Sequence, residues 1–75
     1  MPAFERNTNV QWYDGRRNVR GVIKEVHTKP VTRHDIYGKR MERYATEEDP
    51  AYSIRRDDGA HFLKSESEVN AAGGD

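Results

Sequence analysis

The fold is decided by residues 47–64, which read EEDPAYSIRRDDGAHFLK. Apolar and polar residues alternate in two short runs, and the runs are separated by Asp57-Asp58-Gly59. A period of two interrupted by an aspartate–glycine turn is typical of a β-hairpin. Tyr52 and Ile54 share one face of the first run, and Phe62 belongs to the second. The segment therefore predicts a small antiparallel β-domain.

Two runs earlier in the chain also have the pattern of strands. Residues 9–13 alternate, and residues 19–27 are rich in β-branched side chains. The second run does not keep strict alternation, so we predict a β-bulge near Lys24 that lets Ile23 and Val26 both face inward.

The rest of the chain carries weaker signals. Gly21 would permit close packing or sharp coiling of its strand. Residues 31–45 fit either a second hairpin, with its tip at Tyr37-Gly38-Lys39 and strands that run through Ile36 and Tyr44, or a long mobile excursion with few apolar anchors. The sequence SESE at 65–68 fits a capping box, which predicts a single helical turn that docks Val69.

A chain of 75 residues accommodates one domain. We expect a flexible lead-in at 1–8, a barrel at 9–69 and a disordered tail at 70–75. Several short strands in so short a chain predict an all-β, SH3-like barrel of about five strands with a short C-terminal helical turn. The candidates for its thin core are Val10, Trp12, Val19, Val22, Ile23, Val26, Ile36, Tyr44, Tyr52, Ile54, Phe62, Leu63 and Val69.

The cysteine content, the apolar segments and the charge of the chain exclude several classes of protein. The chain has no cysteine, which excludes disulfides and thiolate metal sites and favours the reducing cytoplasm. It has neither an apolar signal-like start nor a segment that could span a bilayer, so we expect a cytoplasmic protein without a membrane partner. The net charge is zero, but residues 1–45 carry ten Lys and Arg against five Asp and Glu, and residues 46–75 carry three against eight. Either the halves neutralise each other on folding, or one face of the domain is basic.

Five segments occur in the order expected for a known family: Val10-Gln11-Trp12, RGVIKEVH at 20–27, Gly38-Lys39, DPAYSI at 49–54 and LKSESEV at 63–69. On these segments the chain resembles the hypervirulence-associated protein Tudor-domain family of small bacterial and fungal proteins. The resemblance covers about residues 9–69 and implies a Tudor-like, SH3-type barrel. It implies little about activity, because the family is named for a fold and a phenotype. The family often has a Gly-Asp pair before its first strand, where this chain has Asn7-Thr8-Asn9.

Tudor relatives that read methylated Lys or Arg use a cage of aromatic rings, whose faces attract a cation. Trp12, Tyr52 and Phe62 are equally well explained as core, because a thin barrel needs its largest rings for burial. Tyr13 and Tyr37 are then the exposed pair. The available rings are Trp12, Tyr13, Tyr37, Tyr44, Tyr52 and Phe62.

Basic residues interleaved with tyrosines could instead contact phosphates. The alternative is a solvated strand edge whose charges discourage aggregation. The zero net charge weighs against a dedicated nucleic-acid binder. The residues concerned are Arg16, Arg17, Arg20, Lys24, Lys39, Arg40 and Arg43.

The sequence favours neither a metal site nor catalysis. His27 and His34 are seven residues apart, His61 is distant, and no cysteine is near them, so we expect no metal and no cofactor. The carboxylate run at 47–49 reads as a solvated loop, and no nucleophile elbow or phosphate-binding glycine loop is present. We expect a protein that is not an enzyme.

We therefore predict a non-catalytic interaction module with a protein or peptide partner. Weak nucleic-acid binding through the basic N-terminal half is the alternative, and a purely structural protein is a third possibility. The aromatic side chains would supply contact area and the arginines charge complementarity; the ligand and the oligomeric state stay open. The hypothesised binding surface comprises Trp12, Tyr13, Arg16, Arg17, Tyr44 and Tyr52.

Overall fold

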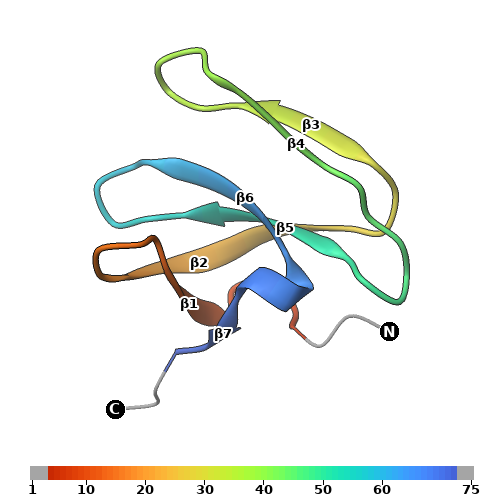
Figure 1. Cartoon of the computed structure of the whole chain (residues 1–75), viewed down its shortest axis with the longest axis horizontal. Helices are drawn as coiled ribbons and strands as arrows, with labels where there is room; N and C mark the ends of the chain where they lie inside the picture. The colour runs from red at the N-terminus through yellow and green to blue at the C-terminus, as the bar shows by residue number, and fades with distance from the viewer. Residues whose placement is uncertain (1–3, 73–75) are drawn as a thin grey trace.

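The computed structural model of the chain describes residues 4–72, which form strands and one short 3-10 turn (Figure 1). The predicted all-β fold with a C-terminal helical turn is confirmed. The elements are β1 (Asn9–Tyr13), β2 (Asn18–His27), β3 (Val31–His34), β4 (Arg40–Arg43), β5 (Ala51–Arg55), β6 (His61–Ser65), the 3-10 turn η1 (Glu66–Glu68) and β7 (Asn70–Ala71).

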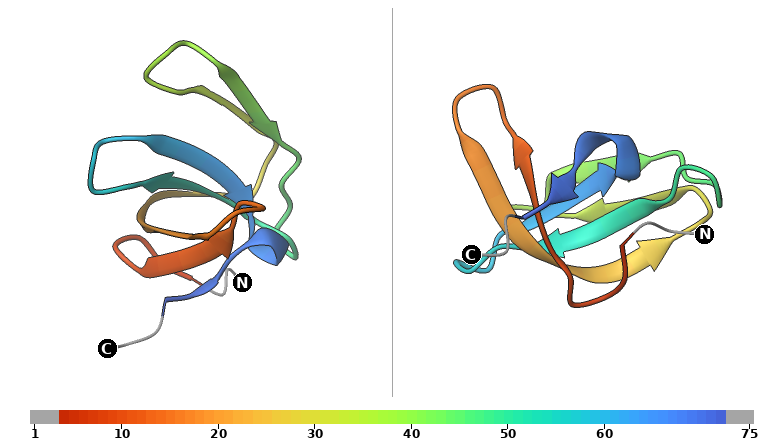
Figure 2. Two further views of the ribbon diagram at one scale, coloured as in Figure 1. Left: turned by 60° about the vertical axis from the view of Figure 1, so that its left-hand side comes forward. Right: turned by 90° about the horizontal axis from the view of Figure 1, so that it is seen from below.

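Five strands form one antiparallel sheet in the order β6-β5-β2-β1-β7; together with β3 and β4, the described residues form seven strands in two sheets, more than the roughly five that were predicted. In a flat sheet with strands about 4.8 Å apart, β6 and β7 would lie roughly 19 Å from each other. Only η1 and Val69 connect them, and a 3-10 turn rises only about 2 Å per residue, so the sheet must curl. Figure 2 shows η1 bridging the two edges. Within the described residues, β6 and β7 do not pair, so hydrogen bonds between these edges do not close the sheet into the predicted barrel, and η1 connects the two edges.

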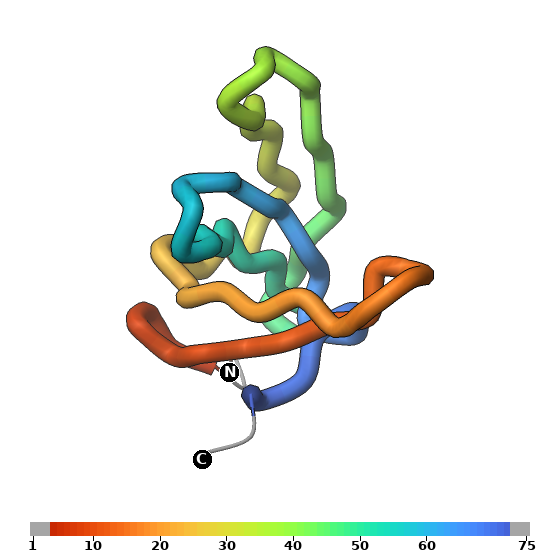
Figure 3. The backbone as a smooth tube through the Cα atoms, turned by 90° about the vertical axis from the view of Figure 1, so that its left-hand side faces the viewer, coloured from red at the N-terminus to blue at the C-terminus, as the bar shows by residue number. Residues whose placement is uncertain are grey.

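The remaining two strands, β3 and β4, pair only with each other and form a separate hairpin. Figure 3 shows this hairpin projecting from the curled sheet. Of the two interpretations of residues 31–45, the hairpin is confirmed. Its strands are shorter than expected, because Ile36 lies in the tip and Tyr44 follows β4. Both side chains are exposed, at 58% and 76%, so their prediction as core residues is wrong.

The predicted β-bulge in β2 is confirmed. The pairing with β5 shifts between Ile23, which faces Ile54, and Glu25, which faces Ser53, and this leaves Lys24 as the extra residue. Ile23 is fully buried, and Val26 packs against the same core. The bulge therefore turns the two apolar residues inward and places Lys24 and Glu25 together on the outer face.

Two glycines meet backbone requirements that other residues would not. Gly59 in the β5–β6 turn has a φ of 89°, in the left-handed region that favours glycine. A β-carbon at Gly21 would overlap Cγ2 of Ile54 across the sheet. The predicted Asp-Asp-Gly turn and the close approach at Gly21 are both present.

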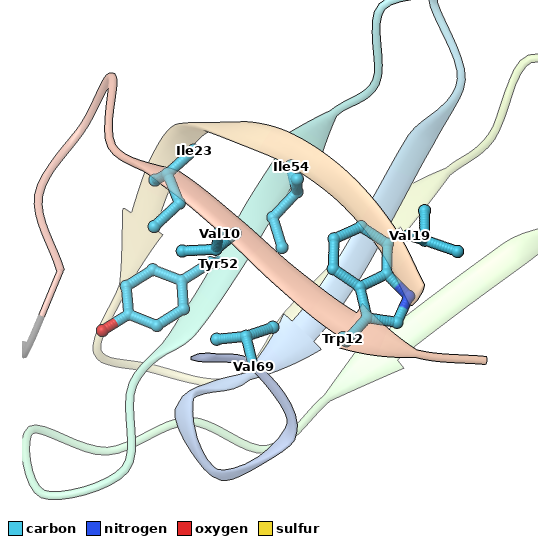
Figure 4. Packing of buried hydrophobic residues seen from close by; sticks show 7 residues of the cluster. All are labelled: Val10, Trp12, Val19, Ile23, Tyr52, Ile54 and Val69. Carbon is cyan, nitrogen blue, oxygen red and sulfur yellow. The ribbon is translucent and has the colours of Figure 1, made fainter. Parts of the chain in front are cut away.

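The main core fills the concave side of the curled sheet. Figure 4 shows the rings of Trp12 and Tyr52 among the aliphatic side chains. Phe62 packs edge-on against Trp12 with ring centroids 5.1 Å apart. Trp12, Tyr52 and Phe62 thus belong to or border the core. The buried members are Val10, Trp12, Val19, Ile23, Tyr52, Ile54 and Val69.

A second, smaller cluster lies on the opposite, outer face of the sheet. Ala51 and Leu63 from β5 and β6 are buried there together with Ala45. Val31 of β3 and Met41 of β4 pack against them and are partly buried. This cluster attaches the β3–β4 hairpin to the outer face of the sheet.

The C-terminal turn is anchored as predicted. The Ser65 amide donates to Oε1 of Glu68 at 2.7 Å, and Val69 is buried. The hydroxyl of buried Tyr52 donates to Oε1 of Glu66 at 2.8 Å, which ties η1 to the middle of β5.

The predicted ends of the domain lie partly outside the described residues, since 1–3 and 73–75 are not described. Before β1, Phe4 packs edge-on against Tyr52, and the Asn7 amide donates to the Ile23 carbonyl at 2.7 Å. After Val69, β7 pairs with β1. No helix in the described part of the chain has the length and apolar character needed to cross a membrane.

Candidate binding groove

The structure separates the six residues of the hypothesised binding surface. Trp12 and Tyr52 are 3% and 0% exposed, so neither ring has a face available to a ligand. Tyr13, Arg16 and Arg17 are exposed at the β1–β2 turn.

Tyr44 lies at the other end of the sheet from that turn. Tyr13 pairs with Asn18 at the start of β2, whereas Tyr44 follows Arg43, which pairs with Val31 beyond the end of β2. Figure 1 shows the β1–β2 turn and the connection from β4 to β5 on opposite sides of the molecule. The six residues therefore do not form one surface.

A groove of about 530 Å³ lies elsewhere, between the β3–β4 hairpin and the outer face of β2, β5 and β6. Its volume is within the range of ligand pockets, roughly 300–1,000 Å³. Met41 contributes apolar surface to it, and Phe62 lies at its edge with its ring turned to the core side against Trp12. The basic and imidazole side chains that line it are Arg6, Lys24, Arg33, His34, Arg55 and His61.

The β2 bulge determines what the groove contains. Because two residues of β2 replace one at this point, Lys24 and Glu25 both line the groove. Across the sheet, Arg55 of β5 pairs with His61 of β6, and both also line it. Bulges re-aim side chains next to functional sites in many proteins.

Glu25 is the one carboxylate that lines the groove within the described residues, and it is already engaged. Its Oε1 accepts from Nε of Arg33 at 3.2 Å and lies 3.3 Å from Nε2 of His27. Burial alone raises the pKa of Glu25, but hydrogen bonds from Arg33 and Ser53 and nearby positive charge outweigh burial and hold that pKa below its usual value. Glu25 is therefore ionised at neutral pH.

One cluster at the groove has the residue types of a catalytic triad but not its geometry. It consists of Ser53, His27 and Glu25. The Ser53 hydroxyl lies 2.9 Å from Nε2 of His27, and the Glu25 carboxylate contacts the same nitrogen. A working triad needs the serine and the carboxylate on different ring nitrogens. Burial, together with the nearby charge of Arg33, lowers the pKa of His27 despite the neighbouring Glu25 carboxylate, so the ring is mostly neutral at pH 7. The cluster fixes side chains at the groove wall.

The histidines do not gather for metal binding. In the described part of the chain, no three His, Cys, Asp or Glu side chains lie close enough together to hold an ion. The groove does contain His34 and His61, but they stand among cations, which disfavour a metal ion there.

One family of proteins matches the chain: hypervirulence associated proteins TUDOR domain, over residues 8–69. The chain belongs to this family. A comparison of the chain with curated proteins and a comparison with solved structures each found no match. Tudor domains are in general small binding modules, so the family supports a binding role without naming a ligand.

The backbone just before β1 has an uncommon conformation at Asn7. Its φ is 71°, which lies in the left-handed region. Asparagine tolerates this region better than most residues other than glycine. The strand β1 begins two residues later, at Asn9.

A methyl-cation cage, as in some Tudor domains, would need converging aromatic faces. The exposed rings are Tyr13 at 67%, Tyr37 at 88% and Tyr44 at 76%. They come from the end of β1, the β3–β4 tip and the β4–β5 connection. None of the three lines the groove. The groove itself carries cations, which repel a cationic ligand.

The sequence identified Lys24, His34 and His61 as separate candidates, but it did not predict that they line one groove. Arg55 was missed, although it alternates with Tyr52 and Ile54 and so had to face away from the core. The signal was present as the polar half of the β5 pattern. The sequence did not predict that the β3–β4 hairpin covers that face of the sheet.

Proposed function

We propose that this Tudor domain is a non-catalytic module that binds a protein or peptide segment in the groove between β3–β4 and the outer face of the sheet. The groove itself is the observation that carries this proposal: it has ligand-sized volume, apolar surface from Met41, and polar side chains along its walls. Pockets with these features are the usual places of ligand binding.

Chemical-shift mapping on the 15N-labelled protein tests the proposal. Peptides of about ten residues, in acidic, basic and neutral versions, are titrated in turn. We expect shift changes confined to β2 around Lys24, to β5 around Arg55 and to β6 around His61. If none of the peptides perturbs these amides at millimolar concentration, the groove is not a peptide site.

The β1–β2 turn supports a second candidate function, which is weak nucleic-acid binding. The observation that favours it is the exposed ring of Tyr13 beside the exposed Arg16 and Arg17, a pattern suited to base stacking and phosphate contact. The Asp14 carboxylate accepts from the amides of Arg16 and Arg17 at 2.9 and 3.0 Å, which fixes the turn backbone.

A salt titration with oligothymidylate separates the two functions. Phosphate contacts make affinity fall steeply as salt rises. If the turn binds nucleic acid, the double variant Arg16→Glu/Arg17→Glu abolishes the interaction. If affinity depends little on salt or survives this variant, the turn has no such function.

A further inference from the structure

We infer that the groove selects an acidic segment of a partner protein, one whose Asp and Glu carboxylates enter between β3 and β5. This inference rests on the proposed binding function and names the chemistry of its ligand. Four cationic side chains line the groove against the single carboxylate of Glu25. The excess positive charge attracts carboxylates and repels lysine-rich or methylated-lysine segments.

Two of the four cations are unengaged. In the part of the chain that the structure describes, Lys24 and Arg55 are in no ion pair, and both side chains are exposed. They come from neighbouring strands and face the same space. An arginine that can bind bidentately and a lysine on the neighbouring strand suit two carboxylates of one extended segment.

The Glu25 carboxylate occupies the position on Arg33 that a carboxylate of the ligand would take. It holds Arg33 at 3.2 Å, and the two side chains remain 50% and 45% exposed. An entering carboxylate can displace Glu25 from Arg33, because an exposed ion pair of this kind is weak. Removing the charge of Glu25 therefore strengthens binding, whereas an ordinary structural role would predict no gain.

The groove fits a peptide better than a nucleic acid. Single-stranded nucleic acids need exposed rings on which bases stack. Tyr13, Tyr37 and Tyr44 are the strongly exposed rings of the described chain, and none lines the groove. The apolar surface of Met41 is suited instead to the aliphatic part of a peptide chain.

Fluorescence anisotropy with labelled peptides of about ten residues tests the inference. The probes are Glu-Gly, Lys-Gly and Ser-Gly repeats of equal length, with oligothymidylate as a fourth ligand. The variants are Arg55→Glu, Glu25→Gln and, as a charge-matched control outside the groove, Lys29→Glu. Heteronuclear NMR spectra first confirm that each variant keeps the fold.

We expect the Glu-Gly peptide to bind most tightly. Arg55→Glu weakens it about tenfold, Lys29→Glu changes it by less than about twofold, and Glu25→Gln tightens it roughly two- to fivefold.

Other outcomes overturn the inference in distinguishable ways. Equal or tighter binding of the Lys-Gly or Ser-Gly peptide, or equal effects of Arg55→Glu and Lys29→Glu, removes the acidic ligand while the binding module stands. Preference for oligothymidylate assigns the cations to phosphates instead. Absence of binding by every peptide removes the proposed function as well.

Discussion

Gly21 is the position at which a single atom matters most. A β-carbon there would overlap Cγ2 of Ile54 and would lie 3.1 Å from the carbonyl oxygen of Arg55. The strand β2 can therefore lie this close to the end of β5 only without a side chain at this point. Because Arg55 lines the groove, the same contact positions a ligand-facing residue.

Gly21→Ala should lower the free energy of unfolding by about 1–3 kcal/mol, the usual cost of overpacking a core. Urea denaturation measures it. Leucine lacks the Cγ2 methyl of isoleucine, so the double variant Gly21→Ala/Ile54→Leu should cost less than the sum of the two single variants. Strict additivity would mean that the overlap with Ile54 is not the source of the cost.

Among the elements, η1 connects the β3–β4 hairpin to the five-stranded sheet. Nε and Nη2 of Arg43 in β4 donate to the Glu68 carboxylate at 2.7 and 3.2 Å, and the Ser65 amide donates to the same group. Burial alone raises the pKa of Glu68, but these bonds outweigh burial and hold the pKa below its usual value. One carboxylate thus fastens β4 and caps the 3-10 turn.

A lowered pKa in the folded state makes Glu68 stabilising above its unfolded pKa, and this stabilisation is lost as the pH falls through the folded pKa. Glu68→Gln should therefore destabilise the domain at pH 7. The difference from the native chain should shrink as the pH falls below about 4.5. Urea unfolding at several pH values measures this. A difference that is constant with pH would exclude a charge effect.

The β3–β4 hairpin depends on the small outer cluster. Met41 packs against Ala45, Ala51 and Leu63, and it is only partly buried. Met41→Ala should cost about 1–2 kcal/mol, less than for a fully buried methionine. Hydrogen exchange should accelerate in β3 and β4 while amides of β1 and β2 stay protected. Equal acceleration throughout would show that the hairpin and sheet unfold as one unit.

At the scale of the whole molecule, the sequence predicted the sheet much better than the site. Alternation in β1 and β5 identified one buried face, and the broken alternation around Lys24 identified the bulge. These signals are local and arise from the period of two, so one chain suffices to detect them. The Asp-Asp-Gly turn and the capping serine–glutamate pair are local in the same way.

The site depends on contacts between distant segments, which no local pattern carries. Tyr44 was assigned to a strand and to the core, but β4 ends before it. The opposite net charges of residues 1–45 and 46–75 also did not predict the site. The groove combines Lys24 and Arg33 of the basic half with Arg55 of the acidic half. Only the folding of the hairpin over the outer face brings these side chains together.

The groove exists because the β3–β4 hairpin packs on the outer face of the sheet. Nuclear Overhauser spectroscopy on methyl-labelled protein tests it most directly. We expect cross-peaks between the methyl of Met41 and the methyls of Ala51 and Leu63. A folded protein that shows the Trp12 core contacts but lacks these cross-peaks would contradict it.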